Sequence, residues 1–303
     1  MSRIISLLAS ATDTIYALGL IDNLVGRSHE CDNPPQIMNL PVCTKPKFET
    51  DGSSYEINEK MKAILENSIS VYKVDRDLIE TLKPSHIITQ TQCNVCAVSL
   101  NDLEDIICNT LSTRPSIISL EPNNLNDVFN DILKIGQNLG VSERASELVA
   151  NYKDRINLIK GQIVKTAVRP KVSLIEWINP LMIASNWMPE LLDLLDLEYA
   201  YSTAGKHSKT IDVNQLLEFD PDYIIICPCG FNIDKSLEEW PVLKDKPGFK
   251  NLQAYKSKNI FVANGNDYFN RPGPRIVETV EILAQIVWGF DYGHLNKSFV
   301  RVL

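Results

Sequence analysis

Short apolar segments that fit buried β-strands alternate with helical segments along most of this chain of 303 residues. The predicted strands are residues 3–8, 24–28, 86–89, 116–120, 172–175, 223–226 and 260–263. The predicted helices are residues 13–18, 56–66, 77–82, 189–195, 213–217 and 275–288. Alternation of this kind favours parallel sheets that are covered by helices on both faces. We therefore expect an α/β protein with mainly parallel sheets.

The middle of the chain is almost purely helical. Residues 125–139 form one predicted helix, and residues 143–165 form a second helix with Ser142 as its N-cap. At about 1.5 Å per residue, the second helix would be roughly 34 Å long. A helix of this length makes a stiff connector and resists a large hinge rotation. The sequence thus predicts two α/β lobes, 1–122 and 167–303, joined by connecting helices in 123–166.

Residues 82–88 and 219–225 resemble each other, since each runs from a helix end through a proline turn into a strand. Polar residues and cysteines follow both strands. Ligands of open parallel sheets bind beyond the carboxyl ends of the strands. Two lobes that face each other would place both segments at one cleft, which is where we expect the ligand. Chance similarity between two common strand junctions is the alternative explanation.

Charge and hydropathy argue against nucleic acid as a partner and against a membrane span. Lysine and arginine number 30 and aspartate and glutamate 38, which gives a net charge of −8. Nucleic acid is therefore not an expected partner, because phosphate binding needs a cationic face. No run of about 18 apolar residues predicts a membrane span. Residues 4–8 are too few for a signal peptide, so we expect a cytoplasmic protein if Met1 is the native start, and a periplasmic or extracellular one if a leader was removed.

Polar and aromatic side chains at the predicted strand ends are the candidate ligand contacts. They are His29, Glu30, Asp32, Gln92, Cys93, Trp177, Asn179, Trp187, His207, Cys229, Phe231, Asp267, Tyr268 and Arg271. Residues 264–275 form the densest group, and Pro274 fits the first turn of the last helix. Helix N–H groups beside Arg271 and Arg275 favour an anionic group, and we expect Arg271 to pair with Asp267 when no ligand is bound. Solvated loops and ordinary aromatic packing are the alternatives.

Four of the seven cysteines and two histidines suggest a second kind of site. The metal-ligand candidates are Cys93, Cys96, Cys227, Cys229, His29 and His207. Thiolates bind zinc or iron, and a helix start such as the one after Cys96 favours the thiolate form. A redox pair, and structural or ligand-lining thiols, are the alternatives. An odd number of cysteines in a chain of this size does not indicate a disulfide scaffold.

Motifs in a shared order resemble the helix-backbone class, class III, of ABC-transporter substrate-binding proteins, in its cobalamin and iron-siderophore branch. The segments that carry this resemblance are 3–7, 10–13, 17–20, 25–28, 32–35, 82–84, 178–180, 221–225 and 267–271. Residues 29–32, 93–99 and 269–275 resemble a leaderless subgroup that is usually labelled cobalamin-binding. The resemblance spans nearly the whole chain.

The resemblance implies two Rossmann-like lobes joined by a long rigid helix, and a binding protein that captures a cobalamin-type corrinoid or a related metal chelate. We expect a monomer that needs no cofactor. Asp267 and Arg271 fall on the family motif D-[WY]-F-x-R. An ABC permease is the implied protein partner; Asp77 matches the first docking residue, and Asn214 stands at about the second. Tyr72, with Val71, stands where the family has a first-lobe tryptophan.

A role other than solute binding also fits the sequence. The chain shows no Ser/His/Asp order and no phosphate-binding glycine loop, so a catalytic function is the less expected one. The alternatives are a thiol-based metal-binding protein or cytosolic enzyme that uses the strand-end Cys/His cluster, and a protein-interaction module.

Overall fold

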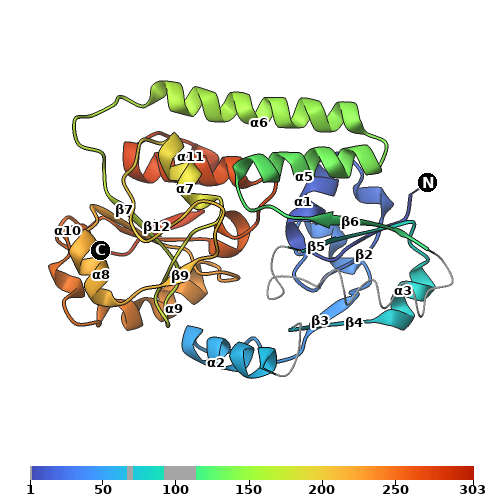
Figure 1. The fold of residues 1–303 in the computed structure, drawn as a ribbon, viewed down its shortest axis with the longest axis horizontal. Coiled ribbons are helices and arrows are strands. Elements are labelled where there is room, and N and C mark those ends of the chain that lie inside the picture. The colour runs from blue at the N-terminus through green and yellow to red at the C-terminus, as the bar shows by residue number, and fades with distance from the viewer. Residues whose placement is uncertain (1, 67–70, 92–113) are drawn as a thin grey trace. The chain divides into compact units, whose positions relative to one another are not determined.

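The computed structural model describes residues 2–66, 71–91 and 114–303, which form two compact units (Figure 1). Unit 1 comprises Met1–Gly52, Glu59–Pro122 and Asn126–Asn151. Unit 2 comprises Ser53–Asn58, Asn123–Leu125 and Tyr152–Leu303. The helical segment predicted as a separate connector, residues 123–166, is therefore divided between the two units.

Unit 1 contains a four-stranded parallel sheet with the order β2-β1-β5-β6. Its strands are β1 (Ile4–Ser6), β2 (Leu24–Arg27), β5 (His86–Gln90) and β6 (Ser116–Leu120). The central strand β1 is buried at every residue, as expected when both faces of a parallel sheet are covered. A small antiparallel pair joins β3 (Thr44–Pro46) to β4 (Tyr72–Val74).

Among the described residues, the helices that lie wholly or mainly in unit 1 are α1 (Ala9–Ala17), α3 (Arg76–Leu82) and α5 (Leu125–Asn138), with 3₁₀ turns at Ile21–Asn23 and Pro35–Asn39. Helix α2 (Ser54–Leu65) begins in unit 2 and continues in unit 1. The predicted helix at 13–18 is confirmed but begins four residues earlier, at Ala9.

Unit 2 contains a six-stranded mixed sheet with the order β12-β11-β10-β7-β8-β9. Its strands are β7 (Val172–Trp177), β8 (Met182–Ile183), β9 (Lys209–Thr210), β10 (Tyr223–Ile226), β11 (Ile260–Ala263) and β12 (Phe299–Arg301). Strands β7, β10 and β11 pair in parallel, whereas β8, β9 and β12 pair antiparallel. The expected parallel arrangement is therefore confined to the centre of this sheet.

The helices of unit 2 are α7 (Met188–Leu194), α8 (Val213–Phe219), α9 (Ile233–Lys244), α10 (Gln253–Lys256) and α11 (Ile276–Trp288), with 3₁₀ turns at Phe249–Asn251 and Gly293–Leu295 and a π-helical turn, η4, at Gly265–Phe269. Helix α11 is apolar and buried over most of its length. Its N-cap is Arg275, so Pro274 precedes the helix and does not lie in its first turn as predicted.

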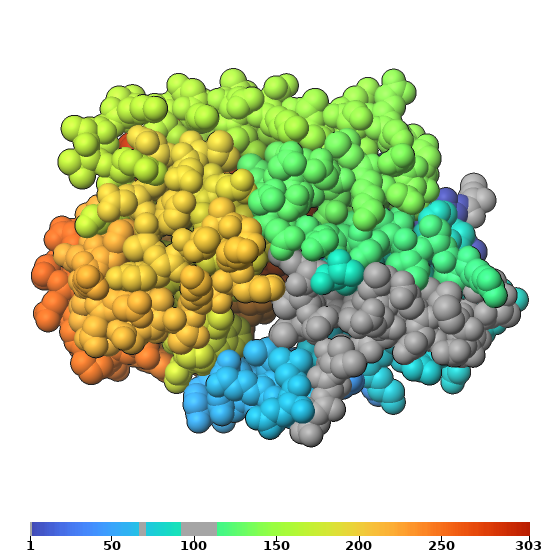
Figure 2. Space-filling view, viewed as in Figure 1, coloured from blue at the N-terminus to red at the C-terminus, as the bar shows by residue number. Residues whose placement is uncertain are grey.

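The long helix predicted in the middle of the chain is α6 (Ser142–Gln162), which has 21 residues. Its buried positions, Ala145, Val149, Tyr152, Ile156 and Ile159, recur every three or four residues and therefore form one apolar stripe. Figure 2 shows the opposite face of the helix open to solvent. Neither α6 nor any other helix in the described ranges is both long enough and apolar enough to cross a bilayer.

Candidate functional site

The carboxyl ends of β7, β10 and β11 lie side by side in unit 2, because parallel strands end at the same edge of a sheet. Backbone bonds connect neighbouring strand ends: Cys229 N, after β10, donates to Glu176 O at the end of β7 over 3.1 Å, and Asn266 N, after β11, donates to Phe231 O over 3.0 Å. Most of the candidate residues predicted in the second half of the chain follow these strands. We call this group of segments the strand-end site of unit 2.

Gly265 allows the loops after β10 and β11 to approach closely. A Cβ atom on Gly265 would lie 2.1 Å from the carbonyl oxygen of Pro228 and 2.7 Å from the carbonyl carbon of Cys227. Nearby, Asn270 Nδ2 donates to Cys227 O over 3.0 Å. Only glycine fits this position, because the obstructing atoms belong to the backbone.

An aromatic pair occupies the strand-end site. The ring centroids of Trp177 and Phe231 are 5.2 Å apart at an interplanar angle of 54°. Phe231 is 6% exposed, whereas Trp177 is only partly buried. The indole Nε1 of Trp177 donates to Ser54 O over 3.1 Å. Trp177 therefore presents the exposed aromatic surface, and Phe231 supports it.

The pairing of Asp267 differs from the prediction. Arg275 Nη1 lies 3.5 Å from Asp267 Oδ1, and the Arg275 guanidinium lies 5.9 Å from the centre of the Tyr268 ring. Asn264 Nδ2 donates to Asp267 Oδ2 over 2.8 Å. Arg271, the predicted partner of Asp267, is only 5% exposed. Arg275, and not Arg271, thus holds the carboxylate of Asp267.

The remaining candidates of unit 2 have different surroundings. Trp187 is 7% exposed and stands at the start of α7, so its ring packs in the interior. His207 is exposed. Ser208, the residue after it, donates to Glu176 Oε2 over 2.7 Å, which brings this loop to the end of β7. Asn179 is partly buried in the turn after β7.

In unit 1, His29 and Glu30 follow β2 and meet Tyr72 of β4. The rings of His29 and Tyr72 are 5.1 Å apart, and the Tyr72 hydroxyl donates to Glu30 Oε1 over 2.7 Å. Asp32 is exposed. Tyr72 was not among the candidate site residues. The signal that points to it is its place at the position of the family's first-lobe tryptophan.

His29 is held as a neutral imidazole. Burial, together with the smaller effect of the nearby Arg27 guanidinium, lowers the pKa of His29 from 6.5 to about 4. Its Nδ1 lies 2.8 Å from Thr44 Oγ1, and its backbone N–H donates to the same hydroxyl over 3.1 Å. A neutral imidazole can donate or accept a hydrogen bond at neutral pH.

The lowered pKa of His29 predicts a pH dependence of stability. The unfolded chain binds a proton at His29 near pH 6.5, whereas the folded protein binds it only near pH 4. The native state therefore loses stability as the pH falls through this window. We expect the free energy of unfolding, measured by urea denaturation at several pH values, to fall less steeply in His29→Gln than in the wild type. Equal slopes in the two proteins would contradict this prediction.

The described cysteines give limited support to a thiol-based metal site. Cys227 is buried, and burial raises the pKa of its thiol well above 9.0. Cys229 is exposed. Within the part of the chain that the structure describes, no group of three or more His, Cys, Asp or Glu residues could hold a metal ion. The predictions for Gln92, Cys93 and Cys96 fall outside the described residues.

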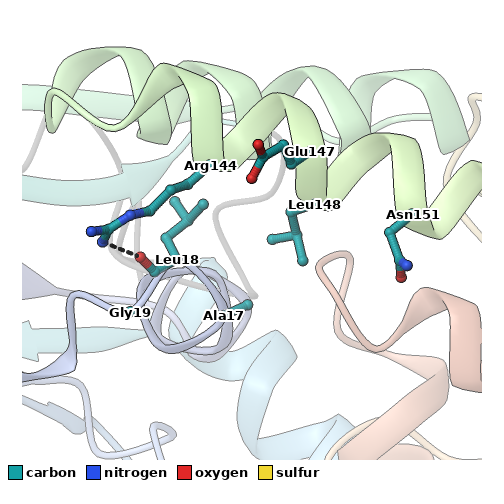
Figure 3. A pocket seen from close by; sticks show the side chains of 7 residues that line it. All are labelled: Ala17, Leu18, Gly19, Arg144, Glu147, Leu148 and Asn151. Carbon is teal, nitrogen blue, oxygen red and sulfur yellow. Dashed lines mark hydrogen bonds between the residues drawn. The ribbon is translucent and has the colours of Figure 1, made fainter.

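A shallow groove of about 550 Å³ lies in unit 1 between the end of α1 and helix α6 (Figure 3). Its lining residues are Ala17, Leu18, Gly19, Arg144, Glu147, Leu148 and Asn151. Arg144 Nη1 donates to Leu18 O over 3.4 Å. None of the candidate ligand contacts that the structure describes lines this groove.

Comparisons with known proteins identify the family. The family profile described as "Periplasmic binding protein" matches residues 4–266. YvrC of Bacillus subtilis (strain 168), an uncharacterized ABC transporter substrate-binding lipoprotein, is 21% identical over 291 residues, which are 94% of this chain and 80% of that protein.

Two solved structures have a similar fold. The periplasmic heme-binding protein RhuT from Roseiflexus sp. RS-1 is 19% identical with a TM-score of 0.70, over 95% of this chain and 98% of that one. The periplasmic vitamin B12 binding protein BtuF of Vibrio cholerae is 19% identical with a TM-score of 0.66, over 94% and 96% of the two chains. These matches confirm the predicted fold class, and the family match shows that the chain belongs to the periplasmic binding protein family.

Proposed function

We propose that this protein binds a cobalamin-type corrinoid or a related metal-chelate ligand, with the strand-end site of unit 2 as a main contact surface. The observation that carries the proposal is the partly exposed indole of Trp177, supported by Phe231 and followed along the same sheet edge by the Asp267–Arg275 pair. A flat macrocycle with polar substituents needs an aromatic surface next to hydrogen-bonding groups. The names of BtuF and RhuT, which bind vitamin B12 and heme, support the same ligand class.

The proposal includes an ABC permease as the partner that receives the ligand. YvrC is named as an ABC transporter substrate-binding lipoprotein, which supports this assignment. Asp77 is exposed in the first turn of α3, and Asn214 is exposed in α8. Both side chains are accessible to a docking protein within their own units.

Ligand titration tests the proposed function. Purified protein is titrated with cyanocobalamin, hydroxocobalamin, cobinamide and hemin, and binding is followed by calorimetry and tryptophan fluorescence. We expect saturable binding of at least one compound with a Kd well below about 1 mM, which corresponds to about 4 kcal/mol. Binding of hemin alone would assign a porphyrin, and binding of the corrinoids alone would assign the cobalamin type. If none of the four binds in this range, the proposal is wrong.

The Trp177→Ala variant tests where the ligand lies. Loss of the indole should weaken binding about tenfold, or about 1.4 kcal/mol, because a ligand ring would lose its stacking partner. Tyr16→Ala is the matched control, since Tyr16 is 47% exposed on α1 and lies outside the strand-end site. Its Kd should stay within about twofold of the wild type. Equal Kd values for Trp177→Ala and the wild type would move the ligand away from this site.

A further inference from the structure

The first turn of α2 is built into unit 2, although residues 59–122 separate it in the sequence from the next segment of that unit. Ser53 begins this turn with a reciprocal cap: its N–H and Oγ donate to Glu56 Oε2 over 2.8 and 2.9 Å, and Glu56 N donates to Ser53 Oγ over 3.3 Å. These bonds pair the N–H and the hydroxyl of Ser53 within the turn. The N–H and the hydroxyl of Ser54 take no part in them and can bond to a more distant acceptor.

Glu239 of α9 is that acceptor. Its Oε2 accepts from Ser54 N over 3.2 Å and from Ser54 Oγ over 2.6 Å. Ser54 is 0% exposed and Glu239 is 6% exposed, so both bonds are shielded from water. A carboxylate at the start of a helix is favoured by the helix dipole, and hydrogen bonds to a charged acceptor are among the strong ones.

The backbone carbonyl of Ser54 connects it to the candidate ligand surface. Its carbonyl oxygen accepts the bond from Trp177 Nε1, and the Trp177 ring packs against Phe231. An indole that is held by one hydrogen bond and one ring contact has little freedom to rotate. The buried carboxylate of Glu239 is therefore connected through a single residue to the orientation of Trp177.

We propose that Glu239 is a positioning residue for ligand binding: it fixes Ser54, whose carbonyl sets the orientation in which Trp177 meets the ligand. The effect on affinity rests on the proposed function, whereas the effect on Trp177 does not. Glu239 accepts both donors in charge-assisted bonds, which are stronger than the bonds that the neutral amide oxygen of Glu239→Gln would accept from the same two donors.

Indole hydrogen exchange in ligand-free protein tests the link directly. The ¹⁵N-labelled indole signal of Trp177 is assigned with Trp177→Phe, and its exchange rate is measured in the wild type and in Glu239→Gln. We expect exchange at Trp177 to be at least tenfold faster in the variant. Trp288 is an internal control, because its Nε1 also donates to a backbone carbonyl, Leu195 O, over 2.9 Å. Its exchange rate should not change.

Glu238→Gln is the matched control variant. Glu238 is the neighbouring residue on α9, its side chain is 67% exposed, and its partner is Lys235. Exchange at Trp177 should be unchanged in this variant. Ser54→Ala is a milder second variant, which removes one of the two donors without changing a charge. It should give a smaller increase in exchange at Trp177, and it provides the test if Glu239→Gln does not fold.

Affinity for hydroxocobalamin and hemin completes the test. We expect Glu239→Gln to weaken at least fivefold the binding of whichever of the two probes the wild type binds, and Glu238→Gln to leave this affinity unchanged. Unchanged exchange at Trp177 in both Glu239→Gln and Ser54→Ala would overturn the proposal. Faster exchange with unchanged affinity would overturn the role of Glu239 in binding. If the wild type binds neither probe, the proposed function fails, and the exchange rates still decide whether Glu239 positions Trp177.

Discussion

Replacement of Arg155 by methionine is expected to lower the free energy of unfolding by about 3 kcal/mol. Arg155 of α6 lies 2.8 Å from Glu281 Oε1 and 3.5 Å from Glu278 Oε1 on α11. The Glu281 side chain is only 7% exposed, so its charge would remain buried after Arg155 is removed. His294, whose Nε2 lies 3.8 Å from Glu281 Oε2, is 63% exposed and replaces little of the lost interaction. The lower end of the usual range applies because Arg155 itself is 31% exposed.

The loss of unfolding free energy in Arg155→Met should depend on pH. Burial already raises the pKa of Glu278, and Arg155 opposes this shift. Without the arginine, the pKa of Glu278 should rise further, so the folded protein holds this proton more tightly than the unfolded chain does, and the variant regains stability as the pH falls. Urea denaturation at about pH 7 and about pH 5 should show the difference from the wild type narrowing at the lower pH.

An exposed ion pair provides the control for Arg155→Met. Lys62 and Glu59 are 59% and 48% exposed, and their charged atoms are 3.0 Å apart. Lys62→Ala should cost no more than about 1 kcal/mol, since exposed pairs contribute little. If Arg155→Met and Lys62→Ala cost the same, the Arg155 cluster does not stabilise the fold.

Substitution of Gly265 by alanine should destabilise the protein by about 3 kcal/mol or more. The added methyl group would overlap the carbonyl oxygen of Pro228, and the loops after β10 and β11 would have to separate. Gly161→Ala is the control: Gly161 lies in α6, and its Cβ would meet no atom within 4 Å. Alanine there should stabilise the helix by about 0.5–1 kcal/mol. Denaturant melts that show Gly265→Ala as stable as the wild type would contradict the close approach.

The sequence predicts strands well where an apolar run is bounded by proline, glycine or polar residues. The bounds of β6, β10 and β11 match the predicted ones, and the helices predicted near α5 and α6 are confirmed within a few residues. The sequence analysis did not predict helix α9, because Pro241 lies inside it and its polar and apolar residues do not separate onto an exposed and a buried face. On α9, Glu239 is buried while Leu237 is 37% exposed. The short strands β3, β4 and β12 depend on pairing with distant residues, which local patterns do not contain.

For the candidate site, the positions of Trp177, Cys229 and Asp267 at predicted strand ends indicated that these residues lie at one edge of a sheet. The choice of Arg275 as the partner of Asp267 could not be predicted, because the π-helical turn η4 sets the direction of the following residues. The prediction that Arg271 pairs with Asp267 assumed ordinary turns between them, and a π-helical turn is rare. The bonds from Ser54 to Glu239 and from Trp177 to Ser54 join residues 185 and 123 positions apart. No motif in the sequence encodes such long-range pairs.

The inclusion of Ser53–Asn58 in unit 2 affects how the chain can be divided. A protein fragment that begins at Tyr152 would contain every strand of the six-stranded sheet. It would nevertheless lack the acceptor for the Trp177 indole and both donors to the buried carboxylate of Glu239. A buried charge without its donors is costly, so such a fragment should be poorly stable. The two units are therefore not interchangeable modules, and recombination between family members that exchanges only the C-terminal half should respect the pairing of Ser54 with Glu239.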